Sequence, residues 1–185
     1  DVSKASSLDA SDRKVLGSSM PTWYGGWNNT VSYKNFDLNV FFRFSGGNKI
    51  MNASRQSALF NMDFSNNGTE ILGRWISPEQ PGDGMTPKIG YGDASSLFND
   101  GYTDSHFVES GNYLKLSTLA LGYTLPKAVV SKLNMTKIRF YVQGQNLLTI
   151  TGYSGLDPET NSRLGVDWNG MPQQRSFTFG ANITF

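Results

Sequence analysis

The chain has 185 residues, a net charge of +1 and no cysteine, which excludes a disulfide framework and a thiolate metal site. Its lysines and arginines are scattered without a run, which argues against a nucleic-acid-binding surface. No apolar run reaches the roughly 18 residues of a membrane helix, and the first residues lack the apolar core of a signal peptide. Aromatic residues make up 13% of the chain. Transmembrane strands remain possible, because their alternation leaves only a weak hydropathy signal.

Two N-terminal segments alternate apolar and polar residues, as strands with two different faces do. The first includes Trp27, Val31 and Tyr33, and a very short turn follows it. The second, residues 36–45, has the clearest pattern. The residues expected on its apolar face are Phe36, Leu38, Val40, Phe42 and Phe44, and those expected opposite include Asp37, Asn39 and Arg43. Both segments are predicted to be strands, joined as a hairpin.

Three further strands are predicted in the C-terminal half. In residues 113–125 the apolar positions change parity near Ser117 and Thr118, which indicates a β-bulge or a strand end outside any apolar layer. Residues 137–148 and 175–185 alternate without a break, and the last segment ends on Phe185. A chain end usually frays unless it is held. An alternation that continues to the last residue therefore needs an explanation.

The connections between the strands alternate in length. Residues 33–36 and 126–136 form short links, whereas residues 46–112 and 151–174 form long ones. Outer-membrane barrels combine short periplasmic turns with long extracellular loops, and their strands span the membrane with about 9 to 11 residues. We therefore predict an all-β fold, an antiparallel transmembrane β-barrel segment of about five strands with long extracellular loops. Apolar residues at helical spacing in residues 48–62 predict a short helix in the first long loop.

A β-sandwich or jelly roll would show the same alternation, since one face of each sheet is then a dry core. Aromatic residues near the predicted strand ends favour the barrel, because such residues form belts at membrane interfaces. These residues are Trp23, Tyr24, Trp27, Tyr33, Tyr123, Tyr153 and Phe185.

Five stretches, in a fixed order and spacing, carry a family pattern. They are residues 17–50 (GSSMPTWYGGWNNTVSYKNFDLNVFFRFSGGNKI), 74–83 (RWISPEQPGD), 105–126 (SHFVESGNYLKLSTLALGYTLP), 141–159 (YVQGQNLLTITGYSGLDPE) and 172–185 (PQQRSFTFGANITF). Together they resemble the C-terminal end of SusC/RagA-type TonB-dependent transporters. The resemblance implies a barrel of about 22 strands with an N-terminal plug, of which residues 1–185 would be the last five strands.

The same resemblance implies a location in the outer membrane of a Gram-negative cell and import of glycan or peptide fragments. The implied partners are a SusD-like lipoprotein, the TonB complex and the barrel assembly machinery, with outer-membrane lipid around the strands. Since five strands cannot close a barrel and open edges are costly in lipid, we expect the chain to be a fragment of a longer polypeptide that contains the plug and the remaining strands.

Two sets of residues are candidate sites. Trp75, Tyr91 and Trp168 lie on the predicted extracellular loops, where a large ring could stack on a sugar or peptide, pack under the partner, or pack within its own loop. The terminal strand resembles an assembly signal of outer-membrane proteins. Its signal residues would be Phe177, Phe179 and Phe185; an ordinary edge strand is the alternative.

Enzymatic chemistry and cofactors are not predicted. The only histidine, His106, has no nucleophile elbow near it, and a lone loop histidine is usually solvated. Asp157 and Glu159 flank a proline, which favours a braced turn over a glycosidase pair. The family often carries an acidic loop near the region of Asp9 and Asp12, but these provide too few oxygen ligands for calcium.

Two other functions remain open at this stage. A passive porin or adhesin-like barrel would contain the same strands, since none of these residues shows energy coupling. A secreted carbohydrate-binding β-sandwich would explain the aromatic and neutral polar residues. A plug with a TonB box would distinguish a transporter from a passive barrel, and detergent dependence would distinguish both from the secreted sandwich.

Overall fold

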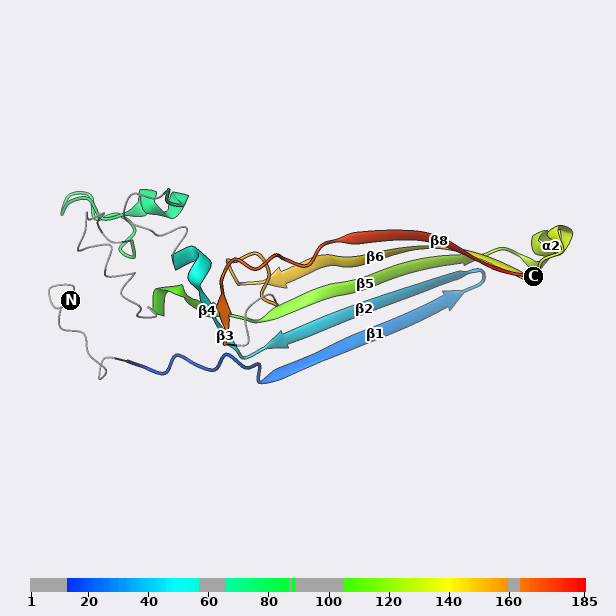
Figure 1. The fold of residues 1–185 in the computed structure, drawn as a ribbon, viewed down its shortest axis with the longest axis horizontal. Coiled ribbons are helices and arrows are strands. Elements are labelled where there is room, and N and C mark those ends of the chain that lie inside the picture. The colour runs from blue at the N-terminus through cyan, green and yellow to red at the C-terminus, as the bar shows by residue number, and fades with distance from the viewer. Residues whose placement is uncertain (1–12, 57–65, 87, 89–104, 160–163) are drawn as a thin grey trace. The chain divides into compact units, whose positions relative to one another are not determined.

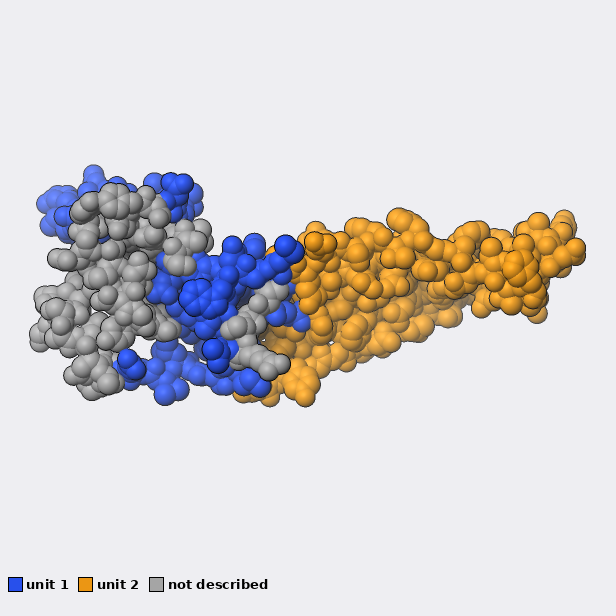
Figure 2. Space-filling model, viewed as in Figure 1, with its two compact units in different colours: residues 1–20, 48–110, 153–171 blue, residues 21–47, 111–152, 172–185 orange. Residues whose placement is uncertain are grey.

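The computed structural model describes residues 13–56, 66–86, 88, 105–159 and 164–185. The chain divides into two compact units, shown in different colours in Figure 2. Unit 1 comprises residues 1–20, 48–110 and 153–171, and unit 2 comprises residues 21–47, 111–152 and 172–185. No helix in the described part of the chain is long and apolar enough to cross a membrane.

Unit 2 is a five-stranded antiparallel sheet in the order β1-β2-β5-β6-β8 (Figure 1). Its strands are β1 (Trp23–Tyr33), β2 (Phe36–Gly46), β5 (Tyr113–Thr124), β6 (Lys137–Thr151) and β8 (Ser176–Thr184). All five predicted strands are present, and each pairs with the one before it. β1 begins earlier and β6 runs further than predicted, and the bounds differ by one residue at the end of β2, at the end of β5 and at both ends of β8.

The pairing register gives the sheet one apolar and one polar face. Residues opposite each other in neighbouring strands share a face. One apolar row across the sheet consists of Val31, Leu38, Leu121, Val142 and Phe179. The next row, on the other face, consists of Ser32, Asp37, Gly122, Tyr141 and Gly180. The predicted alternation of β2 is therefore confirmed.

The bulge predicted near Ser117 is present. Phe41 pairs with Thr118 but Phe42 pairs with Leu116, so Ser117 is the extra residue of β5. On β6 the same interruption includes Asn146, which has a positive φ of 52°. The bulge brings the apolar residues of both halves of β5 onto one face, because the inserted residue reverses the parity.

Aromatic pairs strengthen the apolar face of the sheet. Trp27 stacks on Phe42 with the ring centroids 5.8 Å apart, and the ring centroids of Phe36 and Tyr123 are 4.7 Å apart. This face is open to the surroundings, with 78% of Phe179 exposed. An apolar face of this kind normally requires an apolar partner or lipid. Of the predicted aromatic belt, Tyr24 lies opposite Ser45 and therefore on the polar face.

The polar face contains an ion pair that crosses a strand. Arg139 donates from Nε to Oδ1 of Asp37 at 2.9 Å and from Nη2 to Oδ2 at 2.5 Å. Gly122 lies between them, and a Cβ there would collide with both side chains. The missing side chain on β5 thus allows β2 and β6 to interact directly.

Short helical turns link β5 to β6. They are α2 (Lys127–Val130) and the 3-10 helix η6 (Ser131–Leu133). Val130 is buried, and its carbonyl accepts a hydrogen bond from the Met135 amide. The link between β1 and β2 is a tight turn with Lys34 in the left-handed region at φ 54°.

Unit 1 has a small sheet that the sequence did not predict. Its strands are β3 (Lys49–Asn52), β4 (Val108–Ser110) and β7 (Val166–Asp167), in the order β4-β3-β7. The described part of unit 1 also contains two 3-10 helices, η4 (Thr69–Gly73) and η5 (Ser105–Phe107). Phe107 is fully buried and packs with Met51 and Ile71. The long loops thus form their own core.

The helix predicted over residues 48–62 is wrong at its start, where β3 lies. Ala53 and Ser54 are α-helical and Arg55 and Gln56 continue as a π-helical turn, whereas residues 57–62 lie outside the described part of the chain. A short apolar run does not by itself distinguish strand from helix. Here β3 pairs with β4 and β7, and these long-range backbone hydrogen bonds favour the strand.

Candidate functional site

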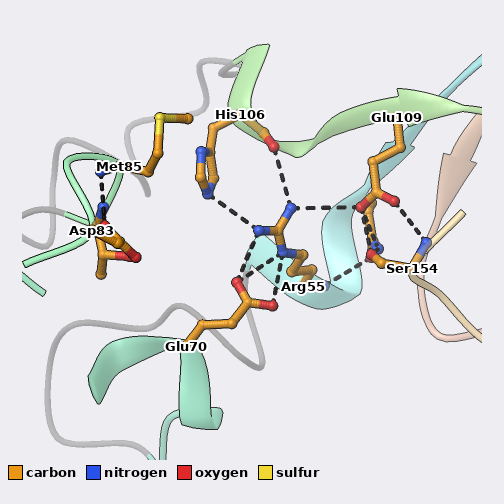
Figure 3. A network of polar contacts seen from close by, with 9 residues as sticks. Arg55, Glu70, Asp83, Met85, His106, Glu109 and Ser154 are labelled. Atoms are coloured by element: carbon orange, nitrogen blue, oxygen red, sulfur yellow. Dashed lines mark hydrogen bonds and ion pairs between the residues drawn. The ribbon is translucent and has the colours of Figure 1, made fainter. Parts of the chain in front are cut away.

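The side chain of Arg55 connects several segments of unit 1 (Figure 3). Its Nε donates to both carboxylate oxygens of Glu70, at 3.1 and 3.0 Å, and its Nη2 donates to Oε2 at 2.8 Å. A planar guanidinium that meets a carboxylate in this way is held in one orientation. The pair fixes η4 to the turn that follows β3.

The other edge of the same guanidinium meets η5. Nη1 of Arg55 donates to the His106 carbonyl at 3.3 Å, and Nη2 lies 3.3 Å from His106 Nε2. Because a guanidinium only donates, Nε2 can take part in this contact only as a hydrogen-bond acceptor. The ring also meets Phe107 edge-on at 4.9 Å. The expectation of a solvated histidine is wrong, since His106 is half-buried in a packed network.

Glu109 extends the network to the second long loop. It accepts hydrogen bonds from the amide of Ser154 at 2.7 Å and from its hydroxyl at 2.6 Å. Nδ2 of Asn52 donates to Oε1 of the same carboxylate at 3.1 Å, and Nη1 of Arg55 lies 3.6 Å from that oxygen. Carboxylates that accept several charge-assisted and backbone bonds fix the segments that donate them. Both long connections therefore share one polar anchor (Figure 3).

A second anchor joins Tyr153 to Asp167. The Tyr153 hydroxyl donates to Oδ2 of Asp167 at 2.6 Å, and both side chains are buried. Oδ1 of Asp167 accepts from the amides of Asn169 and Gly170. Burial, and then the hydrogen bond to Asp167, raise the pKa of Tyr153 above its ordinary value. The assignment of Tyr153 to a membrane-interface belt is wrong, because its ring is in the interior of unit 1.

Trp168 is presented to the outside by this second anchor. It follows Asp167 directly in the chain, and 72% of its side chain is exposed. The amides after it are fixed by the Asp167 carboxylate, so the backbone that carries the ring is held while the ring is free of a core. A large exposed ring on a held loop is suited to stacking on a ligand.

Trp75 lies on a different, tightly turned segment. Its amide donates to the Thr86 carbonyl at 2.9 Å, and the ammonium of Lys88 lies 5.8 Å from its ring. Asp83 closes the turn by accepting from the amides of Met85 and Thr86, bonds that hold the pKa of Asp83 below its ordinary value. With 36% of Trp75 exposed, part of the ring is accessible.

Of the three predicted ligand-contacting residues, the structure describes Trp75 and Trp168. Within the described residues, no ring contact joins Trp75 to Trp168. Tyr91 lies outside the described part of the chain, as do Asp9 and Asp12. The anchoring residues Arg55, Glu70 and Glu109 were not predicted. Their charges lie far apart in the sequence, and no local pattern pairs them.

The acidic residues considered for glycosidase chemistry, Asp157 and Glu159, have a structural contact. Asp157 accepts a hydrogen bond from the Glu159 amide at 3.0 Å, which is the braced turn expected around the proline between them. In the described ranges no group of three or more histidine and acidic residues could hold a metal ion. The exposed indoles and the lysine beside Trp75 offer stacking and cation–π contacts to a ligand.

The predicted assembly residues lie on and beyond β8. Phe177 and Phe179 are on the apolar face, opposite Gly144 and Val142 of β6. Phe185 follows the end of the strand and is largely exposed. β8 pairs with β6 alone, so its other edge carries unpaired backbone groups.

No family model matches the chain, but individual proteins do. TonB-dependent receptor P3 of Formosa agariphila is 32% identical over 188 residues, which cover 96% of this chain and 18% of that protein. TonB-dependent receptor SusC of Bacteroides thetaiotaomicron is 25% identical and is matched over 96% of this chain and 16% of its own length. The chain therefore spans less than a fifth of the length of these relatives.

Solved structures agree with these relatives. The RagAB peptide importer in its open-open state superposes with a TM-score of 0.78 at 26% identity, over 97% of this chain and 19% of that one. Its closed-closed state gives a TM-score of 0.79 over the same shares. The matched regions include both the sheet and the long loops. The chain belongs to the TonB-dependent receptors of the SusC/RagA type, as a C-terminal barrel segment.

Proposed function

We propose that this protein is the SusC-like component of an outer-membrane, TonB-dependent importer of glycan or peptide fragments. The observation that carries the proposal is the five-stranded antiparallel meander with an exposed apolar face and a polar face, in a chain of this family. The peptide named for the RagAB importer supports one of the two substrate classes. Polypeptide regions outside residues 1–185 would supply the plug and the remaining strands.

The apolar face of the sheet lies against lipid in this proposal, and the polar face lines the lumen. A charged or polar side chain on the lipid face is costly, whereas the lumen is polar. The charges of β2 agree with this division, because Asp37 and Arg43 share the face opposite Leu38 and Val40. Within unit 2 no second sheet covers the apolar face, whereas a secreted sandwich would need one there.

Trp75, Tyr91 and Trp168 are proposed to contact the substrate or the partner. A SusD-like lipoprotein would cap the extracellular mouth, and energy would come from the TonB complex through the plug. The two anchored segments described above support this role for Trp75 and Trp168, since a ring on a fixed backbone loses little entropy on binding. Binding and transport, without a catalytic group or cofactor, are the roles proposed for these residues.

The terminal strand is proposed to act in assembly. Phe177, Phe179 and Phe185 would be recognised by the barrel assembly machinery, after which the free edge of β8 pairs with the first strand of the full barrel. Both edges of the described sheet, β1 and β8, support a closure step, because an open edge in lipid leaves backbone groups without partners.

An uptake experiment tests the importer proposal. Cells that express the full-length protein with its neighbouring lipoprotein are given fluorescent oligosaccharides or oligopeptides, with and without a functional TonB system. We expect accumulation of one substrate class that disappears without TonB. Accumulation that persists without TonB would identify a passive barrel, and a protein that stays soluble without detergent would contradict the membrane assignment altogether.

A further inference from the structure

One end of the sheet of unit 2 has a distinct lysine-rich surface. Asn35 in the β1–β2 turn exchanges hydrogen bonds with Thr124 at the end of β5, so this turn and the α2–η6 link lie at the same end. The surface, here called the basic turn surface, consists of Lys34, Lys127, Val129, Lys132 and Leu133. We propose that it docks on anionic phospholipid headgroups of the leaflet at this end of the barrel. The inference rests on the membrane insertion proposed above.

The charge of this end is strongly positive. Residues 31–40, 120–141 and 178–185 contain a single acidic side chain, that of Asp37, and Arg139 neutralises it. The three lysines of the basic turn surface are exposed and form no ion pair within the described residues. Lysines gathered beside a membrane attract anionic lipids electrostatically.

The same surface carries apolar side chains between the lysines. Val129 is 45% exposed and Leu133 is 53% exposed, although the adjacent Val130 is buried. Burial of Val130 and the hydrogen bond to its carbonyl hold the link between β5 and β6 in place. The exposure of Val129 and Leu133 is therefore a property of the folded link. Apolar residues that alternate with lysines are typical of segments that lie in a membrane interface.

The position of the surface along the strands also fits the headgroup region. The apolar face of β2 begins at Phe36, which lies against Tyr123, and Tyr33 is exposed beside it. Aromatic rings at strand ends mark the membrane interface. Lys34 follows Tyr33 immediately, with its ammonium 5.3 Å from that ring. The ammonium groups of this end therefore lie just beyond the apolar band, at the depth of lipid phosphates.

The test measures which lipids surround this surface. The full-length receptor, with no other cysteine, carries Ser131→Cys labelled with a fluorophore and is inserted into nanodiscs of phosphatidylcholine and phosphatidylglycerol. Quenching by brominated phosphatidylglycerol is compared with quenching by brominated phosphatidylcholine at equal lipid fractions. The variants are a combined Lys34→Gln, Lys127→Gln, Lys132→Gln change, the matching three Lys→Arg changes, and Lys14→Gln as an exposed lysine outside unit 2.

We expect brominated phosphatidylglycerol to quench the fluorophore of the parent protein more strongly than brominated phosphatidylcholine does. The ratio of the two quenching efficiencies should fall by up to about fivefold for each lysine replaced by glutamine. The Lys→Arg and Lys14→Gln variants should keep it. Equal quenching by both lipids in a properly inserted parent, or a preference that survives the Gln changes, would overturn the inference. Failure of the parent to form a heat-resistant barrel in the nanodisc would instead contradict the proposed function, so the two failures are distinguishable.

Discussion

Tyr141 in β6 lies directly opposite Gly180 in β8, and its ring covers the space that a side chain at Gly180 would need. A Cβ at Gly180 would stand 2.5 Å from Oη of Tyr141. An aromatic ring over a cross-strand glycine pins the register of the pair. Because β8 pairs with β6 alone in this sheet, this contact is one of the few that position the terminal strand.

Gly180→Ala is therefore expected to weaken the pairing of β8. The Tyr141 ring must swing away, and overpacking of this kind costs about 1 to 3 kcal/mol. The loss should appear as a lower urea midpoint of the refolded full-length receptor. Gly152→Ala is the matched control, because no atom lies within 4 Å of a Cβ at that position.

The double variant Gly180→Ala, Tyr141→Ala extends this prediction. Removing the ring relieves the collision, so the two changes together should cost less than the sum of the single changes. Equal midpoints for Gly180→Ala and Gly152→Ala would show that the contact does not hold the strand.

Arginine at Val40 and at Asn39 should have very different effects. Val40 pairs with Leu119 on the apolar face, and Asn39 pairs with Ala120 on the polar face. An arginine near the midplane on the lipid side costs about 2 to 4 kcal/mol, and one in the lumen much less. The free energy of unfolding, measured by urea titration in lipid vesicles, separates Val40→Arg from Asn39→Arg. Similar losses at both positions would refute the proposed facing.

Tyr153→Phe should loosen the loop that carries Trp168. The change keeps the ring but leaves Oδ2 of the buried Asp167 without the hydroxyl that now donates to it at 2.6 Å, a loss of about 1 to 3 kcal/mol. Hydrogen exchange at the amides of Asn169 and Gly170 should accelerate. Tyr33→Phe, at an exposed ring, serves as the control, and unchanged exchange in Tyr153→Phe would mean that other contacts hold the loop.

Alanine at Trp75, Tyr91 and Trp168 is expected to weaken substrate capture while the amount of inserted barrel stays the same. A stacked ring contributes about 1 kcal/mol, so each ring that contacts the substrate should change affinity about fivefold. Binding of labelled substrate is measured per inserted copy. Leu164→Ala provides an exposed apolar control in the same unit. Capture equal to that of the parent would exclude these loops from the binding site.

Deletion of Phe185 should reduce assembly and leave transport intact. Burial of one terminal ring contributes about 1.5 to 3 kcal/mol, which is small beside the hydrogen bonds of a whole barrel. Phe185 also lies beyond the last residue of β8. We therefore expect less heat-resistant barrel at the cell surface but normal uptake per inserted copy. Wild-type abundance would leave the residue a structural role only, and reduced uptake per copy would place it in transport.

Local alternation was sufficient to predict the strands of unit 2. Successive side chains of a strand point to opposite faces, so the alternation of residue types predicts the apolar and polar faces of β2. The change of parity in the same alternation predicts the bulge at Ser117. The sequence also determined the class of connection, since the hairpin turn at Lys34 and the link after Pro126 are short. The contact between the Tyr141 ring and Gly180 could not be predicted in this way, because it depends on the register in which β6 pairs with β8.

Only the tertiary structure decided the arrangement of the long loops. Arg55 meets Glu70, His106 and Glu109 across as many as 54 positions of sequence, and Tyr153 is buried against Asp167. The sequence predicted a solvated His106, an interfacial Tyr153 and a helix where β3 lies. These errors have one physical reason: in the loops, side chains and short strands are stabilised by partners distant in the chain, which override the local pattern.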